Sequence, residues 1–316
     1  MRTEAHDGTL VSVIIPTYNR ATLVTEAMDS VRNQTYRPIE CIVVDDGSTD
    51  DTREVVADWK REHETNKLTV RLLRQQNRGA PAARNRGMEA ASGGFLLFLD
   101  SDDRLVPDAV ALLRRTLSES GRDVAYGDIQ LMEGPGQTRR REQRPSSSSH
   151  VVNMLNNAPQ TSSALIRRNA VASVRWREDL PRAQEFAFFI DLALEGKQFT
   201  YVPTVVLVKD QRPERKGISN RQHEDYAATI ARILVRREES FRELGVAENR
   251  AYDRGLMYHS NLLSRKGALD LAGRLRQRTH LGRVLHSLRR HWSSHVFLTT
   301  VLPPRWSARV YTLLGK

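Results

Sequence analysis

The sequence predicts an α/β fold, in which a mostly parallel sheet carries helices on both faces and a basic helical C-terminal region follows. Three observations predict it. Short apolar runs alternate with helix-like stretches in the first half of the chain. These runs are almost continuously apolar, as in parallel strands that are buried on both faces. The pattern then becomes helical from about residue 221, so we expect domains at 1–220 and 221–316.

Six apolar runs predict the strands, which we place at 11–15, 39–44, 68–73, 95–99, 123–132 and 199–208. Apolar residues at helical spacing predict the helices between them, at 20–34, 51–63, 80–92, 107–120 and 185–196. Pro107 suits the start of its helix, where a missing N–H costs no hydrogen bond. The stretch 133–150, "EGPGQTRRREQRPSSSSH", is rich in Gly, Pro, Ser and Arg and predicts an exposed, mobile loop.

The composition is that of a soluble globular protein, with 39% hydrophobic and 28% charged residues among 316. The first residues, "MRTEAHDGTL", contain no apolar h-region, so we expect no signal peptide, and no run approaches the roughly 20 residues of a membrane-spanning helix. We therefore expect a cytoplasmic protein. The single cysteine, Cys41, excludes a disulfide framework or a cysteine-based zinc site within these residues, and we expect it in the core.

The net charge of +11 lies in one region, because residues 254–316 hold twelve Lys and Arg and one acid. Within it, "LGRVLHSLRRHW" (281–292) places apolar residues at helical spacing and arginines off that stripe. Such a helix can contact an anionic membrane surface, here the inner face, or pack on the rest of the chain. We expect no nucleic-acid partner, since the chain shows no recognition motif and few interleaved aromatic residues.

Polar clusters follow three of the predicted strands, in "VII-PTYN", "IVV-DDGSTD" and "LFL-DSDD". Ligands of open α/β sheets bind beyond the carboxyl ends of the strands, so we expect the three clusters to meet at one edge. Arg84 belongs to the helix 80–92, whose start faces that edge. A guanidinium there would pair with phosphate, and the alternative is a solvated helix face.

The cluster "DSDD" suggests a cation site. On an extended backbone Asp100 and Asp102 share one side while Ser101 faces away. Two carboxylates suit Mg²⁺ or Mn²⁺ that takes its remaining ligands from water and a diphosphate. The alternative is that Asp103 or a neighbour caps the helix near Pro107 and the other acids are solvated.

The other two clusters suggest contacts to a nucleoside. Asp45 or Asp46 can accept a hydrogen bond from the ring N–H of a base or from a ribose hydroxyl, although both acids could simply lie in a solvated turn. Ser48 or Thr49 can cap the helix that follows. Tyr18 can stack on a base or lie partly buried among other side chains.

Four stretches in this order, "VSVIIPTYNR", "ECIVVDDGSTDDT", "NRGAPAARNRG" and "FLLFLDSDD", resemble the family-2 glycosyltransferases over roughly residues 10–210. The resemblance implies the GT-A fold and the inverting transfer of a sugar from a nucleotide-diphosphate donor. UDP is the favoured nucleotide, with dTDP and GDP open. The acceptor would be a hydroxyl of a glycan, a lipid-linked molecule or a small molecule.

The resemblance also implies roles for particular residues. Asp45 would contact the base, Asp100 the ribose and Arg84 the base and phosphates, while Asp102 would ligate Mn²⁺ or Mg²⁺. The full set of implied nucleotide-binding residues is Pro16, Thr17, Tyr18, Asp45, Arg84, Asp100 and Ser101.

The family places an acidic pair before an amphipathic helix, and Gln184–Glu185 takes that place in "RAQEFAFFIDLALEG". The resemblance therefore implies Glu185 as the general base, with Asp179 as a competitor. Alternatively Glu185 is an acid that the dipole of its helix favours.

Two further stretches depart from family patterns. "QRPERKGIS" keeps Arg212 and Ser219 but has Glu214 where a His is usual, and "LPPRW" has Leu302 where processive members carry Gln. We expect an enzyme that adds a single sugar.

Two other functions remain open. A nucleotidyltransferase usually has a Gly-rich loop after its first strand, and "PTYNRATL" has no glycine. A non-catalytic module could bind nucleotide sugar or a membrane surface, but the retained "DSDD" and Glu185 disfavour it.

Overall fold

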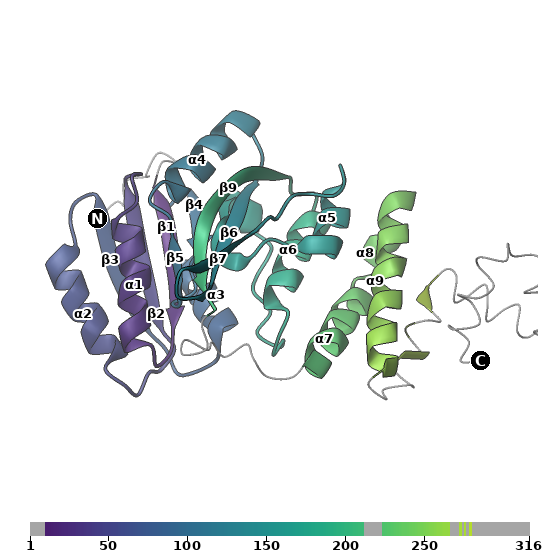
Figure 1. The fold of residues 1–316 in the computed structure, drawn as a ribbon, viewed down its shortest axis with the longest axis horizontal. Helices are drawn as coiled ribbons and strands as arrows, with labels where there is room; N and C mark the ends of the chain where they lie inside the picture. The colour runs from purple at the N-terminus through teal and green to yellow at the C-terminus, as the bar shows by residue number, and fades with distance from the viewer. Residues whose placement is uncertain (1–9, 212–222, 266–271, 274, 276–277, 280–316) are drawn as a thin grey trace, which may run out of the picture.

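The computed structural model describes residues 10–211, 223–265, 272–273, 275 and 278–279, which form a single nine-stranded sheet with helices around it (Figure 1). The strand order along the sheet is β3-β2-β1-β4-β8-β6-β9-β5, and β7 pairs with β6 beside this path. Helices cover both faces of the sheet. The predicted α/β architecture is therefore confirmed.

The N-terminal half supplies the parallel part of the sheet. β1 pairs in parallel with β2 and β4, and β2 with β3, so the carboxyl ends of these strands share one edge. The elements are β1 (Val11–Thr17), α1 (Ala21–Arg32), β2 (Ile39–Asp45), α2 (Thr52–His63), β3 (Leu68–Arg74), α3 (Ala80–Ala90), β4 (Phe95–Phe98), β5 (Asp103–Leu105) and α4 (Ala109–Ser120).

The second half adds mixed strands and a helical layer. β8 lies antiparallel between β4 and β6, while β6 and β9 run parallel. The elements are β6 (Val124–Gly134), β7 (Gln137–Arg141), α5 (His150–Asn157), η1 (Thr161–Ser163), β8 (Ala164–Arg167), η2 (Arg168–Val171), α6 (Gln184–Leu194), β9 (Phe199–Asp210), α7 (His223–Arg236), α8 (Glu238–Arg242) and α9 (Val246–Arg265).

Two apolar layers, one on each face of the sheet, form the core. Successive residues of a strand point to opposite faces, so within β1 Ile14 joins one layer and Val13 and Ile15 join the other. α1, α2 and α4 cover one face, and α3, α5 and α6 cover the other. Cys41 is fully buried in the layer that contains Val13 and Ile15, so the expected core position is confirmed.

The predicted mobile loop at 133–150 is wrong in its central part. Residues 137–141 form β7, which pairs antiparallel with β6 through a turn at Gly136, whose φ is 68°. Every residue of β7 is exposed, so the strand has no apolar face and leaves no hydrophobic alternation in the sequence. The sequence analysis also did not place β5, β8 and α5, which are short.

The predicted helical C-terminal region is confirmed as far as residue 265. Buried residues of α7 and α9, such as Ala231 and Tyr252, belong to the same core cluster as Phe188 of α6. Asp191 of α6 also forms a bidentate pair with Arg237, with both distances at 2.8 Å. The helices therefore pack directly on the sheet-bearing part of the chain.

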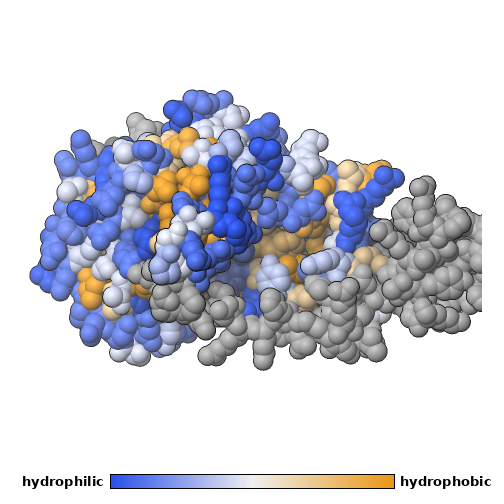
Figure 2. All heavy atoms as spheres, viewed as in Figure 1, coloured by the Kyte–Doolittle hydropathy of each residue, from blue (hydrophilic) through white to orange (hydrophobic). Residues whose placement is uncertain are grey.

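Three predictions on this region are not tested. The proposed boundary at 220/221 falls in 212–222, and the amphipathic stretch 281–292 is also outside the described residues. Its membrane contact stays a prediction. Among the residues described, no helix combines the length and apolar character that crossing a membrane requires. In Figure 2 hydrophilic side chains cover most of the surface over α1 and α2, and hydrophobic ones show nearer α5 and α6.

We expect Asp191→Ala to lower the free energy of unfolding by about 2–4 kcal/mol, because it leaves Arg237 unpaired beside the core. Asp179→Ala is the matched control. Its carboxylate also pairs with an arginine, Arg236, but is 50% exposed, so the loss should stay below about 1 kcal/mol. Urea denaturation measures the free energy of unfolding of both variants. Equal decreases in the two variants would contradict the stabilising role of the Asp191–Arg237 pair.

Candidate active site

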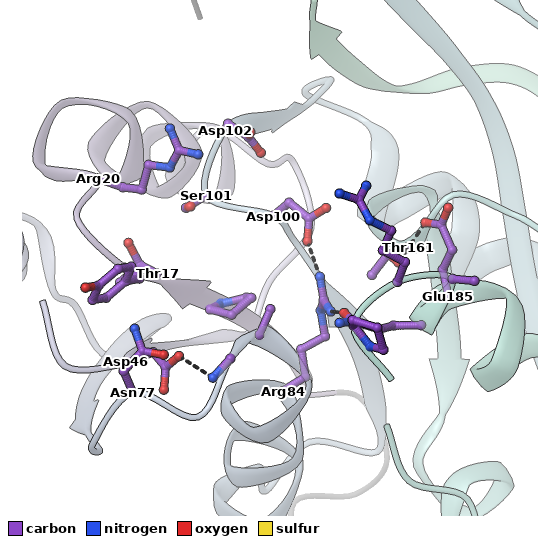
Figure 3. A pocket seen from close by; sticks show the side chains of 18 of the residues that line it. Thr17, Arg20, Asp46, Asn77, Arg84, Asp100, Ser101, Asp102, Thr161 and Glu185 are labelled. Carbon is purple, nitrogen blue, oxygen red and sulfur yellow. Dashed lines mark hydrogen bonds and ion pairs between the residues drawn. The ribbon is translucent and has the colours of Figure 1, made fainter. Parts of the chain in front are cut away.

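A cavity of about 880 Å³ lies at the carboxyl ends of β1, β2 and β4. Thr17, Asp46 and Asp100 line it, so the three polar clusters do meet at one edge as predicted. Figure 3 shows Thr17, Asp46 and Asn77 on one side, the acidic turn and Arg84 in the middle, and Thr161 and Glu185 on the other side. The second half of the chain thus supplies the far wall.

The end of β1 forms one wall through Pro16, Thr17 and Tyr18. Thr17 is buried, and its hydroxyl finds no hydrogen-bond partner among the described residues. Tyr18 is 37% exposed and lines the cavity, so part of its side chain is open to a ligand. A buried hydroxyl without a partner next to an open ring suits a polar, planar ligand.

The two acids after β2 take different places. Asp45 is buried and is not among the residues that line the main cavity. Its Oδ1 accepts from Ser48 N at 2.9 Å, while Oδ2 has no hydrogen bond within the described chain and lies 4.0 Å from Arg74 Nε. Arg74 lines a second cavity of about 470 Å³. The contact of Asp45 with a base stays a prediction.

Asp46, which is not among the implied nucleotide-binding residues, shapes the cavity wall. Its Oδ1 accepts from Gln75 Nε2 at 2.8 Å and Arg78 N at 2.9 Å, and its Oδ2 accepts from Gly79 N at 2.7 Å. These donors belong to the loop before α3. Asp46 therefore fixes the start of the helix that carries Arg84, and no sequence pattern identifies those donors.

The predicted cap of α2 by Ser48 or Thr49 is wrong. Asp50 Oδ1 instead accepts from Thr52 N at 3.1 Å. Ser48 Oγ accepts from Asn19 N at 3.0 Å, and Thr49 N donates to Asn19 Oδ1 at 2.8 Å. These residues tie the loop after β2 to the loop after β1, so they brace the pocket edge rather than the helix.

The acidic stretch after β4 is a turn and not an extended strand end. β4 stops at Phe98, and Asp103 N donates to Asp100 O at 3.0 Å. The expected alternation is therefore wrong, because Asp100, Ser101 and Asp102 all line the cavity. Asp103 is buried and does not cap α4, whose cap position is Asp108.

Two of the three carboxylates in this turn are neutralised by cations from other elements. Asp100 accepts from Arg84 Nη2 at 2.6 Å, and Asp103 from Lys209 Nζ at 3.1 Å. Burial alone would raise the pKa of Asp100, but Arg84 and Lys209 hold it below its ordinary value. Burial raises the pKa of Asp103 to about 7 despite Lys209.

Asp102 differs from Asp100 and Asp103 in its contacts. Oxygen atoms of Asp100, Asp102 and Asp103 lie within 4.8 Å of one another. Asp102 has no hydrogen bond or ion pair with any residue that the structure describes, unlike its two neighbours. Its hard carboxylate oxygens are the ligand type that Mg²⁺ and Mn²⁺ prefer.

Arg84 lies inside the site and not on a solvated helix face. It is only 7% exposed, and its guanidinium lies 4.6 Å from the centre of the Trp176 ring. Besides Asp100 it donates to Gln184 Oε1 at 3.4 Å, while its Nε has no partner within the described residues. The stacking and the ion pair fix this cation against the cavity.

Glu185 lies in the first turn of α6 on the wall opposite Thr17. Its Oε2 accepts from Gln160 Nε2 at 2.6 Å and from Thr161 Oγ1 at 3.3 Å. Burial, followed by the charge of Asp100, raises the pKa of Glu185, although Lys209, Arg84 and the Gln160 bond oppose the shift. A carboxylate of raised pKa in a cleft is suited to take up a proton.

Asp179, the competing candidate, is not among the residues lining the cavity. It pairs with Arg177 at 3.0 Å and Arg236 at 2.7 Å, and these bonds lower its pKa to about 2. A proton acceptor of that strength is poorly matched to neutral pH.

Lys209, Thr161, Arg20 and Tyr226 also line the cavity and were not predicted. Lys209 follows the apolar run 199–208, as a polar residue at a strand end, which is the signal that could have found it. Tyr226 comes from α7, where nothing local marks it. Arg212, Glu214, Ser219 and Leu302 lie outside the described residues.

Sequence comparisons bear on this geometry. A family model described as Glycosyl transferase family 2 matches residues 12–176. An uncharacterized glycosyltransferase of Rickettsia felis is 37% identical over 131 residues, which are 42% of this chain and 21% of that protein. One of Haemophilus influenzae is 28% identical over 189 residues, or 60% of this chain and 74% of the relative.

A Campylobacter jejuni relative named GalNAc(5)-diNAcBac-PP-undecaprenol beta-1,3-glucosyltransferase is 37% identical over 109 residues, or 34% of this chain and 35% of that protein. The chain spans about a fifth of the length of several curated relatives, the Rickettsia felis protein among them.

Solved structures share the fold. S. aureus TarS 1–349 in complex with UDP superimposes with a TM-score of 0.67 and 20% identity, covering 89% of this chain and 87% of that one. The mannosyltransferase PcManGT from Pyrobaculum calidifontis, in complex with GDP-Man and Mn²⁺, has a TM-score of 0.53 and 19% identity, covering 97% and 87%. The predicted GT-A fold is confirmed.

We expect Asp46→Ala to lower the free energy of unfolding by about 2–4 kcal/mol, because it removes a buried carboxylate and leaves three partly buried donors of the loop before α3 without their acceptor. Asp50→Ala is the control. It removes an exposed carboxylate that also accepts backbone bonds, from Thr52 and Ala21, and should lose about 1 kcal/mol or less. Thermal unfolding measures both, and a smaller loss for Asp46→Ala would contradict its bracing role.

Proposed function

Because the chain belongs to glycosyl transferase family 2, we propose that it transfers one sugar from a nucleotide-diphosphate donor to an acceptor hydroxyl, with inversion at the anomeric carbon. One observation carries the proposal. One cavity is lined by Asp100, Ser101 and Asp102 of the acidic turn, by Glu185 and by the cations Arg84 and Lys209. These residues would supply ligands for a charged leaving group and a proton acceptor around one space.

The donor nucleotide would lie along the end of β1. Tyr18 offers an open ring for a base, and the unpartnered hydroxyl of Thr17 offers a polar contact. Arg84 would face the phosphates and Asp100 the ribose. UDP is the first nucleotide to test, since the TarS complex with UDP superimposes better than the GDP-Man complex of PcManGT. dTDP and GDP complete the set.

The residues present fit a divalent cation. Asp102 carries no described partner, and the three carboxylates of the turn bring their oxygens within 4.8 Å. Asp102 would hold Mn²⁺ or Mg²⁺ beside the donor diphosphate. When bound, the ion would offset the negative charge that develops on the leaving nucleotide diphosphate.

The reaction would be one displacement. The acceptor oxygen forms a bond to the anomeric carbon while the bond from that carbon to the donor phosphate oxygen breaks. The proton of the acceptor hydroxyl passes to Glu185, whose raised pKa prepares it for this role. The nucleotide diphosphate leaves with the electron pair, and Arg84 stabilises its charge.

The acceptor would enter from the side of α6 and α7, where Glu185 and Tyr226 line the cavity. We propose a hydroxyl of a growing glycan as the acceptor, either lipid-linked, as the name of the Campylobacter jejuni relative specifies for that protein, or free. The reaction would take place in the cytoplasm, with the stretch 281–292 as a possible contact to the inner membrane face.

We expect Glu185→Gln to reduce the transfer rate at least about 100-fold, because the amide cannot take up the acceptor proton. Binding of UDP with Mn²⁺ should stay within about twofold, since Glu185 lies away from the nucleotide end. Asp179→Asn, an acid outside the cavity, serves as the control. Steady-state rates measure the effect on transfer, and calorimetric titration measures the effect on nucleotide binding. Near-normal turnover of Glu185→Gln would contradict the role of Glu185 as general base.

We expect Asp102→Ala to weaken the binding of UDP in the presence of Mn²⁺ at least about tenfold, and to leave binding with chelator unchanged, because the variant lacks the free cation ligand. Asp108→Ala, which removes an exposed acid at the start of α4, is the matched control.

Calorimetry with UDP, dTDP and GDP, each with Mn²⁺ and with chelator, also tests the donor class. Absence of metal-dependent binding for all three nucleotides in the unaltered chain would contradict the proposed donor site.

A further inference from the structure

The first two residues of the short segment "QTSS", residues 160–163, contact Glu185. Gln160 Nε2 donates to Glu185 Oε2 at 2.6 Å, and Thr161 Oγ1 donates to the same oxygen at 3.3 Å. An ionised carboxylate only accepts, so the amide nitrogen is the atom that faces it. Both donors bind one oxygen, which leaves Oε1 as the atom that can accept a proton.

The next residue of the segment contacts the acidic turn. Ser162 Oγ accepts from Asp100 N at 3.1 Å and donates to Asp103 Oδ2 at 2.7 Å. Ser162 is fully buried. Four consecutive residues therefore connect the end of β4 to the first turn of α6, which are separated by more than 80 positions in the sequence.

Gln160 is itself held by a buried side chain. Gln143 is 1% exposed, and its Oε1 accepts from Gln160 N at 2.8 Å. Its Nε2 donates to Ser163 Oγ at 2.7 Å, and that hydroxyl donates to Gln160 O at 2.8 Å. The backbone N–H and C=O of Gln160 are thus both hydrogen-bonded, which fixes the backbone position from which its side chain extends.

The β6–β7 hairpin anchors Gln143 in turn. Gln143 N donates to Asp128 Oδ1 at 2.9 Å, and Asp128 is fully buried. Asp128 also accepts from Tyr201 Oη at 2.7 Å and from Arg140 Nε at 2.9 Å. A continuous series of hydrogen bonds therefore runs from the hairpin to the carboxylate of Glu185.

We propose that Gln160 is a positioning residue for Glu185, which it holds through the Gln143–Asp128 network so that Oε1 faces the acceptor. The chemical consequence rests on the proposed function, in which Glu185 takes up the acceptor proton. Misplacement of a reacting group by about 1 Å can reduce the rate about 100-fold, so a network that fixes the carboxylate of Glu185 would support the rate of transfer.

The same bond stabilises the charged form of Glu185 and lowers its pKa. The charged and titratable groups that act on Glu185 are Asp100, Lys209, Arg84 and Tyr226, and we expect a change of Gln160 to leave these groups in place. Removal of the bond should therefore raise the pKa of Glu185. Because the reaction needs Glu185 in its ionised form, the acidic limb of the plot of kcat against pH should move to higher pH.

The test compares Gln160→Met with the unaltered chain. Methionine keeps the length of the side chain but cannot donate. Gln198→Met is the matched control, because Gln198 is exposed and bonds to Arg122 far from the cavity. We expect kcat of Gln160→Met to fall about tenfold to 100-fold, with the dissociation constant of UDP and Mn²⁺ unchanged within about twofold.

Gln160→Glu supplies a second readout. A carboxylate beside Glu185 raises its pKa further, so the acidic limb should move to higher pH than in Gln160→Met. Wild-type values of kcat and of the acidic limb in Gln160→Met would overturn the proposal. Equal losses in kcat and nucleotide binding, together with a lower melting temperature, would also overturn it, because they indicate a structural role alone.

A measurement that needs no turnover separates this proposal from the proposed function. The carboxyl carbon of Glu185 is titrated by NMR in ¹³C-glutamate-labelled protein with chelator present, and Glu185→Gln assigns the signal. A higher midpoint in Gln160→Met supports the positioning bond even if no donor sugar is transferred. An unchanged midpoint overturns it even if transfer is observed.

Discussion

Neutralisation of the acidic turn after β4 is the interaction on which the rest of the site depends. Three carboxylates whose oxygens lie within 4.8 Å repel one another strongly when two of them are withdrawn from water. Arg84 pairs with Asp100 and Lys209 pairs with Asp103, so the turn can fold although Asp102 has no partner among the described residues. The positions of α3, which carries Arg84, and of β9, which carries Lys209, are therefore tied to the folding of the turn.

The sheet topology brings these cations to the turn. The parallel order β3-β2-β1-β4 places the ends of three strands at one edge, and the second half of the chain closes that edge from the other side. β9 carries Lys209, and α6 carries Glu185. The cavity thus lies between two parts of the chain, with the proposed nucleotide-binding residues in the first and the proposed proton acceptor in the second.

Hydrogen bonds between loops supply the remaining rigidity. Asp46 fixes the loop before α3, and the segment 160–163 joins the acidic turn to α6. Catalysis of group transfer depends on groups that stay in place without reorganisation, and buried bonded carboxylates and amides provide this. The residues that brace the site are polar and buried, as are Gln143 and Asp128. Substitution of these residues would disturb the positions of the reacting groups without altering which residues supply those groups.

The sequence by itself determined the parallel half of the fold, because buried strands such as "IECIVV" and the helices between them carry their own periodicity. It also placed Asp100, Asp102 and Arg84 at one edge, because the order of motifs along a parallel sheet fixes where its strand ends lie. Only the tertiary structure decided which acids are free, since Asp103 and Asp100 are compensated by partners distant in the sequence. It likewise decided that residues 137–141 form a strand, because β7 is wholly exposed and pairs through its backbone, which leaves no hydrophobic pattern to read.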